Sequence, residues 1–283
     1  MVQNECERYW DDVALEATDS GKAQRLEKWR SAARNWLADY ADRRAEDFVV
    51  DVVGRFVTPK NPFEVLDVGC GPGKWAMLYA KEGAHVTAVD ISPHMIELAK
   101  QNARREEIGG AVAFHVMPVS KLDIPTGTFD LVNCVTVLQH VLDEEEWRKA
   151  VCEMSRVTKK GGYILLFETA PNFAVKKHTA HMRIRTMRRH TDEFKKAGAS
   201  LVYWRAVDLS LPITILGLRH YAASFNKKVH YFLSKRRLPL PAVLSLLSWA
   251  AALVAKQIDY RLGKTPLSFL ATGRILLFRK VRA

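Results

Sequence analysis

The stretch EVLDVGCGPGKW, residues 64–75, constrains the fold of this chain more than any other part of the sequence. Its apolar beginning is typical of a short buried strand, which three closely spaced glycines then end abruptly. The segment that follows, KWAMLYAKEG, has a helical composition and closes at Gly83, a residue type that often terminates a helix. Gly69, Gly71 and Gly73 therefore form a tight turn between a strand and a helix. Glycine permits positive φ angles there and lets a ligand approach the backbone closely.

The residues around this turn indicate which ligand it binds. Dinucleotides use a Gly-x-Gly-x-x-Gly turn and place a pyrophosphate at the helix amino terminus. Here the third glycine comes one residue earlier, and Asp67 precedes the first glycine, where a carboxylate would repel a pyrophosphate but suit an ammonium group. Asp90 ends the next predicted strand, seventeen residues after Gly73, where it can accept hydrogen bonds from a ribose diol. An ammonium partner and a ribose partner describe S-adenosylmethionine better than NAD.

Strand-like and helical segments alternate after residue 62. Strands are expected at residues 65–67, 86–90, 112–116, 131–134 and 163–168. Helices are expected to begin near Lys74, His94 and Glu144. Such alternation favours a parallel sheet with right-handed crossovers. Ligands of these sheets bind beyond the carboxyl ends of the strands, where Asp67, Asp90 and Cys134 all fall.

Four segments in order, VLDVGCGPG, VTAVDIS, FDLVNCVTVLQHV and KKGGYILLFE, resemble the class I S-adenosylmethionine-dependent methyltransferases. The likeness is to the broad small-molecule group around the ubiquinone-pathway type, and it covers about residues 60–170. It implies an α/β fold: a Rossmann-like, doubly wound and mostly parallel seven-stranded sheet, with S-adenosylmethionine as the cofactor. The implied cofactor-binding residues are Asp67, Gly69, Gly71, Gly73, Asp90, Ile91, Val119, Ser120 and Cys134.

The adenine end of the implied site departs from the family pattern. Ile91 is expected against one face of the adenine, with ordinary core packing as the alternative. The family often has an acidic residue just after the third strand, for the adenine amino group, and Pro118 takes that place here. We therefore expect the contact to come from Ser120, from the backbone of Val119, or from water.

Three parts of the chain are expected. A helical cap spans residues 1–60, the S-adenosylmethionine-binding core spans 61–173, and an acceptor-binding carboxyl-terminal part spans 174–283. In the resembled family such leading helices cover the cofactor. Tyr9 and Trp29, together with Trp10, are therefore candidates for the wall of the acceptor pocket, and packing of these aromatic rings onto the core is the alternative.

Two residues are candidates for the chemistry. His140 follows the fourth strand, beside the transferring methyl in this architecture, and a neutral imidazole there can take the acceptor proton near pH 7. A structural role is the alternative, because many relatives carry a histidine at this place whatever their substrate. Glu168, at the tip of the fifth strand, is a candidate for orienting the acceptor. No His, Cys or carboxylate spacing indicates a metal site.

The charge of the chain is unevenly distributed. Residues 174–283 hold 22 Lys and Arg against 4 Asp and Glu, whereas residues 1–173 hold 21 against 27. Lys176, Arg183 and Arg185 belong to a basic cluster after the fifth strand, where acceptor-binding segments usually lie, and arginine suits phosphate oxygens. An anionic acceptor or a basic surface near a membrane would each explain this cluster.

A helical insertion at residues 211–272 is expected before the final strand at 273–281. It contains an uncharged run, residues 238–255, that only reaches the lower limit for spanning a bilayer and holds two prolines and two serines. We expect a helix that either roofs the pocket or makes peripheral contact with an anionic membrane. The dispersed cysteines and the polar amino terminus favour a reducing cytoplasm without a secretory signal.

The sequence therefore predicts an SN2 methyl transfer to a small or lipid-like acceptor, such as an isoprenoid diphosphate or a lipid-linked sugar. The alternative is an RNA methyltransferase that uses the basic carboxyl-terminal half. Against it, no separate RNA-binding module is visible, and NCVT stands where a base-flipping motif such as NPPY would follow the fourth strand. A non-enzymatic partner subunit is a third interpretation, and the intact glycine turn argues against it.

Overall fold

A computed structural model of the chain describes residues 2–19, 36–57, 62–174, 181–207 and 273–282. Trp29, Lys176 and the predicted insertion at 211–272 lie outside the described residues, so their predicted roles stay predictions.

A seven-stranded sheet forms the centre of the structure, with strand order β3-β2-β1-β4-β5-β7-β6. The strands are β1 (Glu64–Val68), β2 (His85–Asp90), β3 (Val112–Val116), β4 (Phe129–Val135), β5 (Thr158–Thr169), β6 (Ala199–Ala206) and β7 (Gly273–Lys280). The first five strands pair in parallel. Strand β7 runs antiparallel between β5 and β6. The predicted Rossmann-like, doubly wound sheet with an antiparallel end is confirmed.

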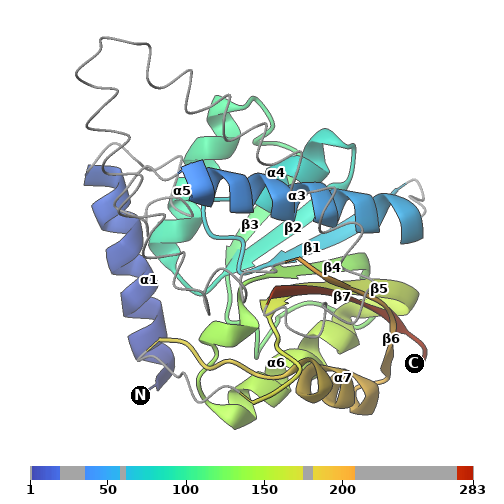
Figure 1. Cartoon of the computed structure of the whole chain (residues 1–283). Helices are drawn as coiled ribbons and strands as arrows, with labels where there is room; N and C mark the ends of the chain where they lie inside the picture. Colours follow the sequence, from blue (N-terminus) through green and yellow to red (C-terminus); the bar gives the residue numbers. More distant parts are fainter. Residues whose placement is uncertain (1, 20–35, 58–61, 175–180, 208–272, 283) are drawn as a thin grey trace, which may run out of the picture.

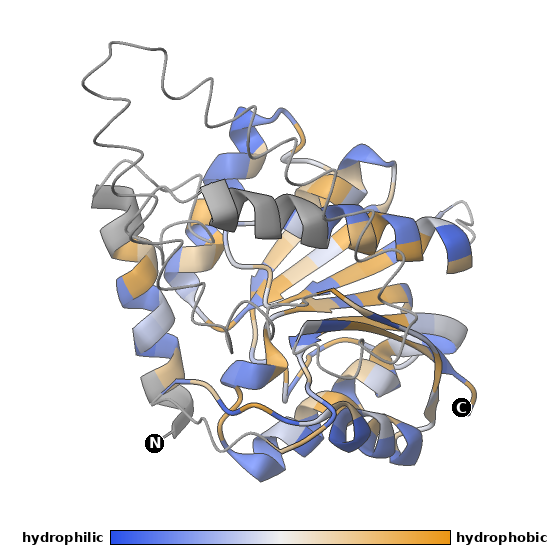
Figure 2. Ribbon diagram, in the orientation of Figure 1, coloured by the Kyte–Doolittle hydropathy of each residue, from blue (hydrophilic) through white to orange (hydrophobic). Residues whose placement is uncertain are grey.

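Helices cover both faces of this sheet (Figure 1). They are α1 (Val2–Asp19), α3 (Trp36–Phe56), α4 (Lys74–Lys81), α5 (Pro93–Arg105), α6 (Glu144–Val157) and α7 (Met187–Lys196), with a short 3-10 turn, η2 (Leu138–His140). Buried residues of α3, α4 and α5 form one core cluster with the strands, and residues of α6 and α7 form the other. The strands are correspondingly apolar, and polar residues colour the outer sides of the helices (Figure 2).

Local sequence explains where the helices begin. Ser92 accepts a hydrogen bond from the N–H of Met95 and precedes a proline at the first turn of α5. Asp143 accepts from two N–H groups in the first turn of α6, which also carries three acidic residues. The predicted starts near His94 and Glu144 therefore agree with the structure to within one residue.

Strand order reverses between β1 and β4. Strands β2 and β3 lie on one side of β1, and β4 and β5 lie on the other. The carboxyl ends of β1 and β4 therefore meet at the point where ligands of open α/β sheets usually bind. The glycine turn follows β1, and η2 follows β4, so both of these segments border that point.

Candidate active site

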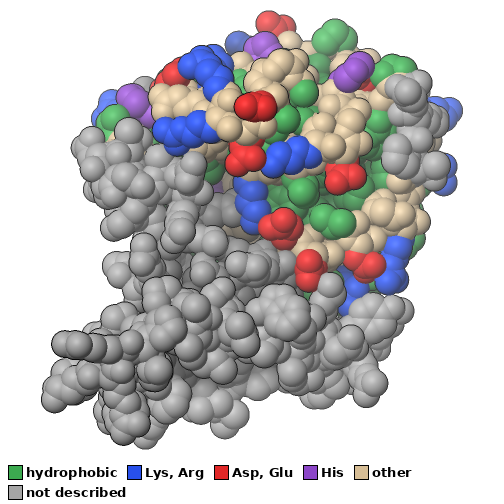
Figure 3. Space-filling view, turned by 90° about the horizontal axis from the view of Figure 1, so that it is seen from above, with side chains coloured by type: hydrophobic (Ala, Val, Ile, Leu, Met, Phe, Trp, Pro, Cys, Tyr) green, Lys and Arg blue, Asp and Glu red, His purple; other side chains and the backbone are tan. Residues whose placement is uncertain are grey.

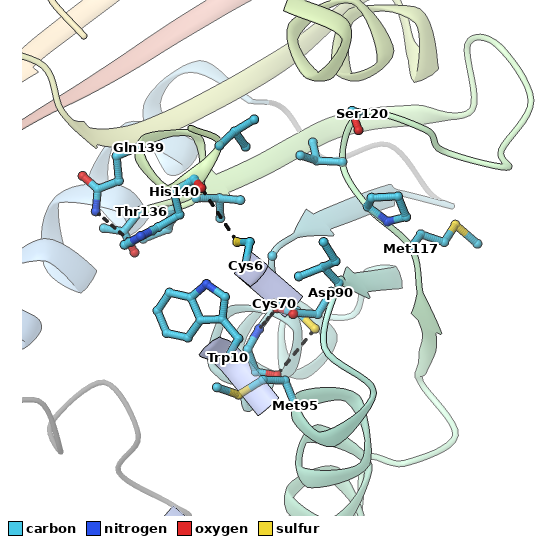
Figure 4. A pocket seen from close by; sticks show the side chains of 18 of the residues that line it. Cys6, Trp10, Cys70, Asp90, Met95, Met117, Ser120, Thr136, Gln139 and His140 are labelled. Carbon is cyan, nitrogen blue, oxygen red and sulfur yellow. Dashed lines mark hydrogen bonds between the residues drawn. The ribbon is translucent and has the colours of Figure 1, made fainter. Parts of the chain in front are cut away.

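A pocket of about 400 Å³ lies at the carboxyl ends of the central strands. Figure 4 shows side chains around it from five parts of the chain: the α1 residues Cys6 and Trp10, Cys70 of the glycine turn, the segment around Asp90, the segment after β3, and the turn after β4. Seven of the predicted site residues line this pocket: Gly69, Gly71, Asp90, Ile91, Val119, Ser120 and His140. The structure thus brings predicted residues from four separate segments into one cavity.

The glycine turn adopts a backbone that other residues tolerate poorly. Gly69 has a φ of 63° and Gly71 a φ of 51°, both in the left-handed region. A Cβ atom at Gly69 would overlap the side chain of Val137 on the turn after β4. A Cβ at Gly71 would meet no heavy atom within 4 Å, so open space adjoins the backbone there. Gly73, by contrast, packs against Ala99 of α5 and does not line the pocket.

The Asp90 carboxylate is fixed at the edge of the pocket. One oxygen accepts a hydrogen bond from the N–H of Gly71 at 2.9 Å, and the other accepts from the N–H of Ser92 at 2.9 Å. Burial raises the pKa of this carboxyl, and the backbone N–H groups act against that rise. Asp90 therefore lines the pocket in the position predicted for a ribose ligand, with its orientation set by the glycine turn.

Asp67 differs from its predicted place. It is 1% exposed and is not among the residues that line the pocket. One carboxylate oxygen accepts from the side-chain amide of Asn133 at 2.8 Å, and the hydroxyl of Tyr79 donates to Asn133 at 3.2 Å. The carboxylate thus belongs to a buried polar network within the sheet, because β1 and β4 place Asp67 directly beside Asn133. Asp67 thus does not line the pocket, and its predicted interaction with the ammonium group, directly or through water, stays a prediction.

Cys134 also lies outside the pocket. Its side chain is fully buried in the cluster beneath α6, because alternate residues of a strand point to opposite faces of the sheet. Its neighbours Val135, Thr136 and Val137 line the pocket instead.

Thr136 has a φ of 58°, unusual for a residue with a β-branched side chain, and its N–H donates to the carbonyl of Phe167 at 2.7 Å. Nothing in the sequence pattern singled out Thr136.

The adenine end of the pocket has a carboxylate that sequence reasoning missed. Val119 and Ser120 line the pocket after β3, as predicted. Glu146 of α6 also lines it, and a hydrogen bond with the Ser120 side chain lowers the pKa of this carboxyl. An acidic side chain therefore lines the pocket beside Ser120 from another element, which the order of the residues along the chain could not reveal.

His140 lies on η2 and faces the pocket, 6% exposed (Figure 4). Its Nδ1 lies 2.8 Å from the carbonyl oxygen of His181, which can only accept, so Nδ1 carries the proton. Nε2 therefore holds the lone pair, and the amide nitrogen of Gln139 donates to it at 3.3 Å. The ring of Trp10 stands edge-on to the imidazole, with ring centroids 5.1 Å apart. The surroundings thus give His140 one defined tautomer.

Glu168 is placed beneath the turn and not in the pocket. It is 1% exposed, and its carboxylate accepts hydrogen bonds from the backbone N–H groups of Val137, Leu138 and Gln139. Burial raises the pKa of Glu168 to about 7, and these N–H groups oppose the rise. Its predicted contact with the acceptor is therefore not what the structure shows.

The arginines predicted for an anionic acceptor contact protein groups. Arg183, Arg185 and Arg189 form ion pairs with Glu144 at 3.5, 3.3 and 2.7 Å. The guanidinium of Arg185 also lies over the Trp147 ring, 4.6 Å from its centroid, and burial lowers the pKa of Arg185 to about 10. Neither Arg183 nor Arg185 lines the pocket. The three arginines follow Glu144 by about forty residues in the sequence, so the spacing of residues along the chain does not predict these ion pairs.

Helix α1 does form part of the pocket wall, but through other residues than Tyr9. Cys6 and Trp10 line the pocket. The Tyr9 ring stacks on His181 instead, with centroids 4.9 Å apart and planes 9° from parallel. Helix α1 thus contributes Cys6 and Trp10 to the pocket wall and Tyr9 does not line it, while the predicted covering of the cofactor by the amino-terminal segment stays a prediction.

The described residues show neither a metal-binding cluster nor a membrane-spanning helix. Within the described ranges, no cluster of three or more His, Cys, Asp or Glu side chains is arranged to hold a metal ion. The helices in this part of the chain are each too short or too polar to cross a bilayer.

Comparison with known proteins supports the resemblance seen in the sequence. Residues 65–162 match a methyltransferase domain family. The ubiquinone biosynthesis O-methyltransferase of Xanthomonas oryzae pv. oryzae (strain PXO99A) is 33% identical over 154 residues, which cover 52% of this chain and 62% of that enzyme. The match thus spans less than two thirds of the length of this curated relative.

Solved structures support the fold. A SAM-dependent methyltransferase of Methanosarcina mazei superposes with a TM-score of 0.53 at 19% identity, over 82% of this chain and 98% of that one. The geranyl diphosphate C-methyltransferase of Streptomyces coelicolor A3(2), solved with Mg²⁺, geranyl diphosphate and S-adenosyl-L-homocysteine, gives 0.56 at 14% identity, over 84% and 80% of the two chains. At these identities the likeness concerns the fold alone.

The pocket fits the cofactor of this family. Open space adjoins the backbone at Gly71, as close approach of a ligand requires. Beside it lie a carboxylate fixed for a ribose at Asp90 and the apolar side chain of Ile91. Residues 65–162 therefore form a methyltransferase domain with the fold of S-adenosylmethionine-dependent methyltransferases, and S-adenosylmethionine is the cofactor that its pocket suits.

Proposed function

We propose that this chain transfers a methyl group from S-adenosylmethionine to a hydroxyl group of a small, largely apolar acceptor. The observation that carries the proposal is the convergence of the glycine turn, Asp90 and His140 on one pocket of about 400 Å³. A cavity of this size suits a small ligand. The name of the matched relatives, ubiquinone biosynthesis O-methyltransferase, favours an oxygen acceptor.

The wall around His140 supports an apolar acceptor. Trp10, Val137 and Val141 line the pocket near the imidazole, and Phe167 lines it from β5. Such a wall gains binding free energy by burying apolar surface of the ligand, at about 25 cal/mol per Å². Gln139 is a polar group within this wall and can orient a hydroxyl.

A diphosphate on the acceptor has less support. Arg183 and Arg185 are paired with Glu144. Lys74 lines the pocket, but it forms an ion pair with Glu46 at 3.2 Å. The isoprenoid diphosphate or lipid-linked sugar thus remains a proposal that draws on the neighbour of similar fold solved with geranyl diphosphate, and on basic residues outside the described ranges.

The chemistry requires little beyond placement. S-adenosylmethionine supplies, when bound, a methyl carbon already activated by its sulfonium, and placement of the reactants can be worth about 7–11 kcal/mol. The lone pair on His140 Nε2 takes the proton of the acceptor hydroxyl as that oxygen forms its bond to the methyl carbon and the carbon–sulfur bond breaks. Gln139 gives up its 3.3 Å hydrogen bond to Nε2 when the hydroxyl arrives. The other proton stays on Nδ1, which donates its hydrogen bond to the carbonyl of His181.

The described part of the face shown in Figure 3 does not favour the RNA alternative. On the face shown in Figure 3, Lys and Arg side chains are interspersed with Asp and Glu, and the described residues there do not form a continuous basic stripe. RNA recognition usually needs such a stripe to track the phosphates.

The test is transfer of label from methyl-labelled S-adenosylmethionine to three acceptors: a prenylated catechol, geranyl diphosphate and total RNA. Labelling of the catechol, with the product identified by mass spectrometry as a methyl ether, supports the proposal. Labelling of geranyl diphosphate alone would move the reaction to carbon and to an anionic acceptor. Labelling of RNA alone would overturn the small-molecule assignment.

A further inference from the structure

The turn that carries Gln139 and His140 is held at its amino end by Glu168. One carboxylate oxygen accepts from the N–H groups of Val137 and Leu138, both at 2.8 Å, and the other accepts from Gln139 at 3.3 Å. The first N–H groups of any helical turn have no partner within the turn, and a carboxylate suits the partial positive charge there. A single buried side chain at the end of β5 thus satisfies three of these groups.

Arg185 holds the other end of the same turn. Its guanidinium donates to the carbonyl oxygen of Leu138 at 3.1 Å and to that of Val141 at 2.9 Å. It is 6% exposed, and Glu144 and the ring of Trp147 fix it from the far side. Leu138 is therefore held through its N–H by a carboxylate and through its carbonyl by a cation.

The segment that contains Arg185 also orients the imidazole. The carbonyl of His181 accepts the Nδ1 proton of His140 at 2.8 Å, and the N–H of Arg183 donates to the carbonyl of Gln139 at 2.7 Å. The Gln139 amide is oriented in turn by the N–H of Thr169, next to Glu168 on β5. Both the backbone and the side chains of the turn thus depend on the same two segments.

We infer that Glu168 and Arg185 are positioning residues that clamp η2 from its two ends and thereby set the orientation of the His140 imidazole in the pocket. The inference rests on the proposed function in one respect, because the reaction for which the clamp positions His140 is the proposed methyl transfer. Neither residue touches the pocket, so the clamp acts through His140 and Gln139. Misplacement of a reacting group by about 1 Å can cost on the order of 100-fold in rate.

Matched pairs of variants separate the clamp from general stability. Arg185→Lys removes the two-pronged contact with the turn, whereas Arg189→Lys alters a neighbouring arginine that pairs with the same Glu144. Glu168→Gln removes the negative charge of the carboxylate and the oxygen that accepts the hydrogen bond from the N–H of Gln139. Its control is Asp130→Asn, because the Asp130 carboxylate also accepts a backbone N–H and pairs with a lysine, at the opposite end of β4.

Two quantities are measured in each variant: the kinetic and binding constants, and the NMR signal of the His140 Nδ1 proton. We expect Arg185→Lys and Glu168→Gln to lower kcat by about 10-fold or more while the Kd for S-adenosylmethionine stays within about twofold, because the cofactor residues are untouched. The second readout is the proton on His140 Nδ1 in histidine-labelled NMR spectra, assigned by its absence in His140→Ala. It should shift or broaden in these two variants and keep its wild-type position in Arg189→Lys and Asp130→Asn.

The outcomes distinguish this inference from the proposed function. An altered Nδ1 resonance supports the clamp even if none of the tested acceptors is methylated, a result that would count against the proposed function alone. Wild-type kcat and an unchanged resonance in both test variants would overturn the clamp. If either buried variant does not fold, Glu144→Gln loosens Arg185 from outside, and an unchanged resonance in that variant would overturn the clamp equally.

Discussion

Two aspartates that look equivalent in the sequence have different surroundings in the structure. Asp67 and Asp90 each stand at the carboxyl end of a parallel strand. The carboxylate of Asp90 lines the pocket and is oriented by the turn, whereas that of Asp67 is bound to Asn133 inside the sheet. At the scale of single residues, a sequence motif therefore predicts where an aspartate lies along its strand. The residues of the neighbouring strand determine which groups its carboxylate contacts.

Asp90→Ala should weaken S-adenosylmethionine binding by about 1–3 kcal/mol, because it removes hydrogen bonds between a charged acceptor and the ribose hydroxyls. Isothermal titration calorimetry measures this change. Asp130→Asn is the control, since Asp130 lies at the far end of β4 and does not line the pocket. An affinity in Asp90→Ala equal to that of wild type would place the ribose elsewhere.

His140→Ala should lower turnover by roughly 10²–10⁴-fold, the usual contribution of a general base, and leave cofactor affinity nearly unchanged. Single-turnover assays measure the rate of the chemical step, with the acceptor that becomes labelled in the test described under Proposed function. Near-normal turnover at neutral pH would assign His140 a structural role, in keeping with its hydrogen bond to His181.

Glu146→Gln tests the adenine end. If the Glu146 carboxylate accepts a hydrogen bond from the adenine amino group, the amide should weaken S-adenosylmethionine binding by about 1–3 kcal/mol. Glu145→Gln is the matched control, because Glu145 is its neighbour on α6 and does not line the pocket. Equal affinities in the two variants would leave the adenine contact to Ser120 or Val119.

At the scale of secondary-structure elements, the order of strands and helices follows from periodicity and turn residues. The Gly-rich turn predicted the start of α4, and the structure shows two further local signals, the capping serine of α5 and the capping aspartate of α6. The roles of Glu168 and Arg185 could not be predicted in this way. Their partners lie on the turn 30–47 residues earlier in the chain, and only tertiary packing decides that these groups meet.

Strand β5 is longer than predicted, because it begins at Thr158 and not at Tyr163. Gly162 makes this possible, since a Cβ there would lie 2.9 Å from the carbonyl oxygen of Lys159 and 3.0 Å from that of Asp130. Gly162→Ala should therefore destabilise the protein by about 1–3 kcal/mol in urea unfolding. Gly110→Ala, where a Cβ meets nothing within 4 Å, should be neutral or mildly stabilising. Equal stability of the two variants would contradict this account of β5.

At the scale of the whole molecule, part of the basic charge of the carboxyl-terminal half is structural. Among the described residues of this half, four basic side chains are buried: Arg185, Arg205, Arg274 and Lys280. Residues 208–272, outside the described ranges, hold a further 9 Lys and Arg against 2 Asp. This remaining charge flanks the uncharged run 238–255 and is therefore the part that can meet an anionic surface.

We expect this segment to bind anionic vesicles peripherally. An apolar run with basic flanks can lie among lipid headgroups, and each basic residue near such a surface adds roughly 1 kcal/mol of attraction, which salt screens. Sedimentation should therefore show salt-sensitive binding to phosphatidylserine vesicles, and Arg236→Glu with Arg237→Glu should abolish it. Arg104→Glu with Arg105→Glu is the control, because it reverses two adjacent exposed arginines at the end of α5. Failure of the wild-type chain to bind either anionic or neutral vesicles would favour a roof over the acceptor pocket as the role of this segment.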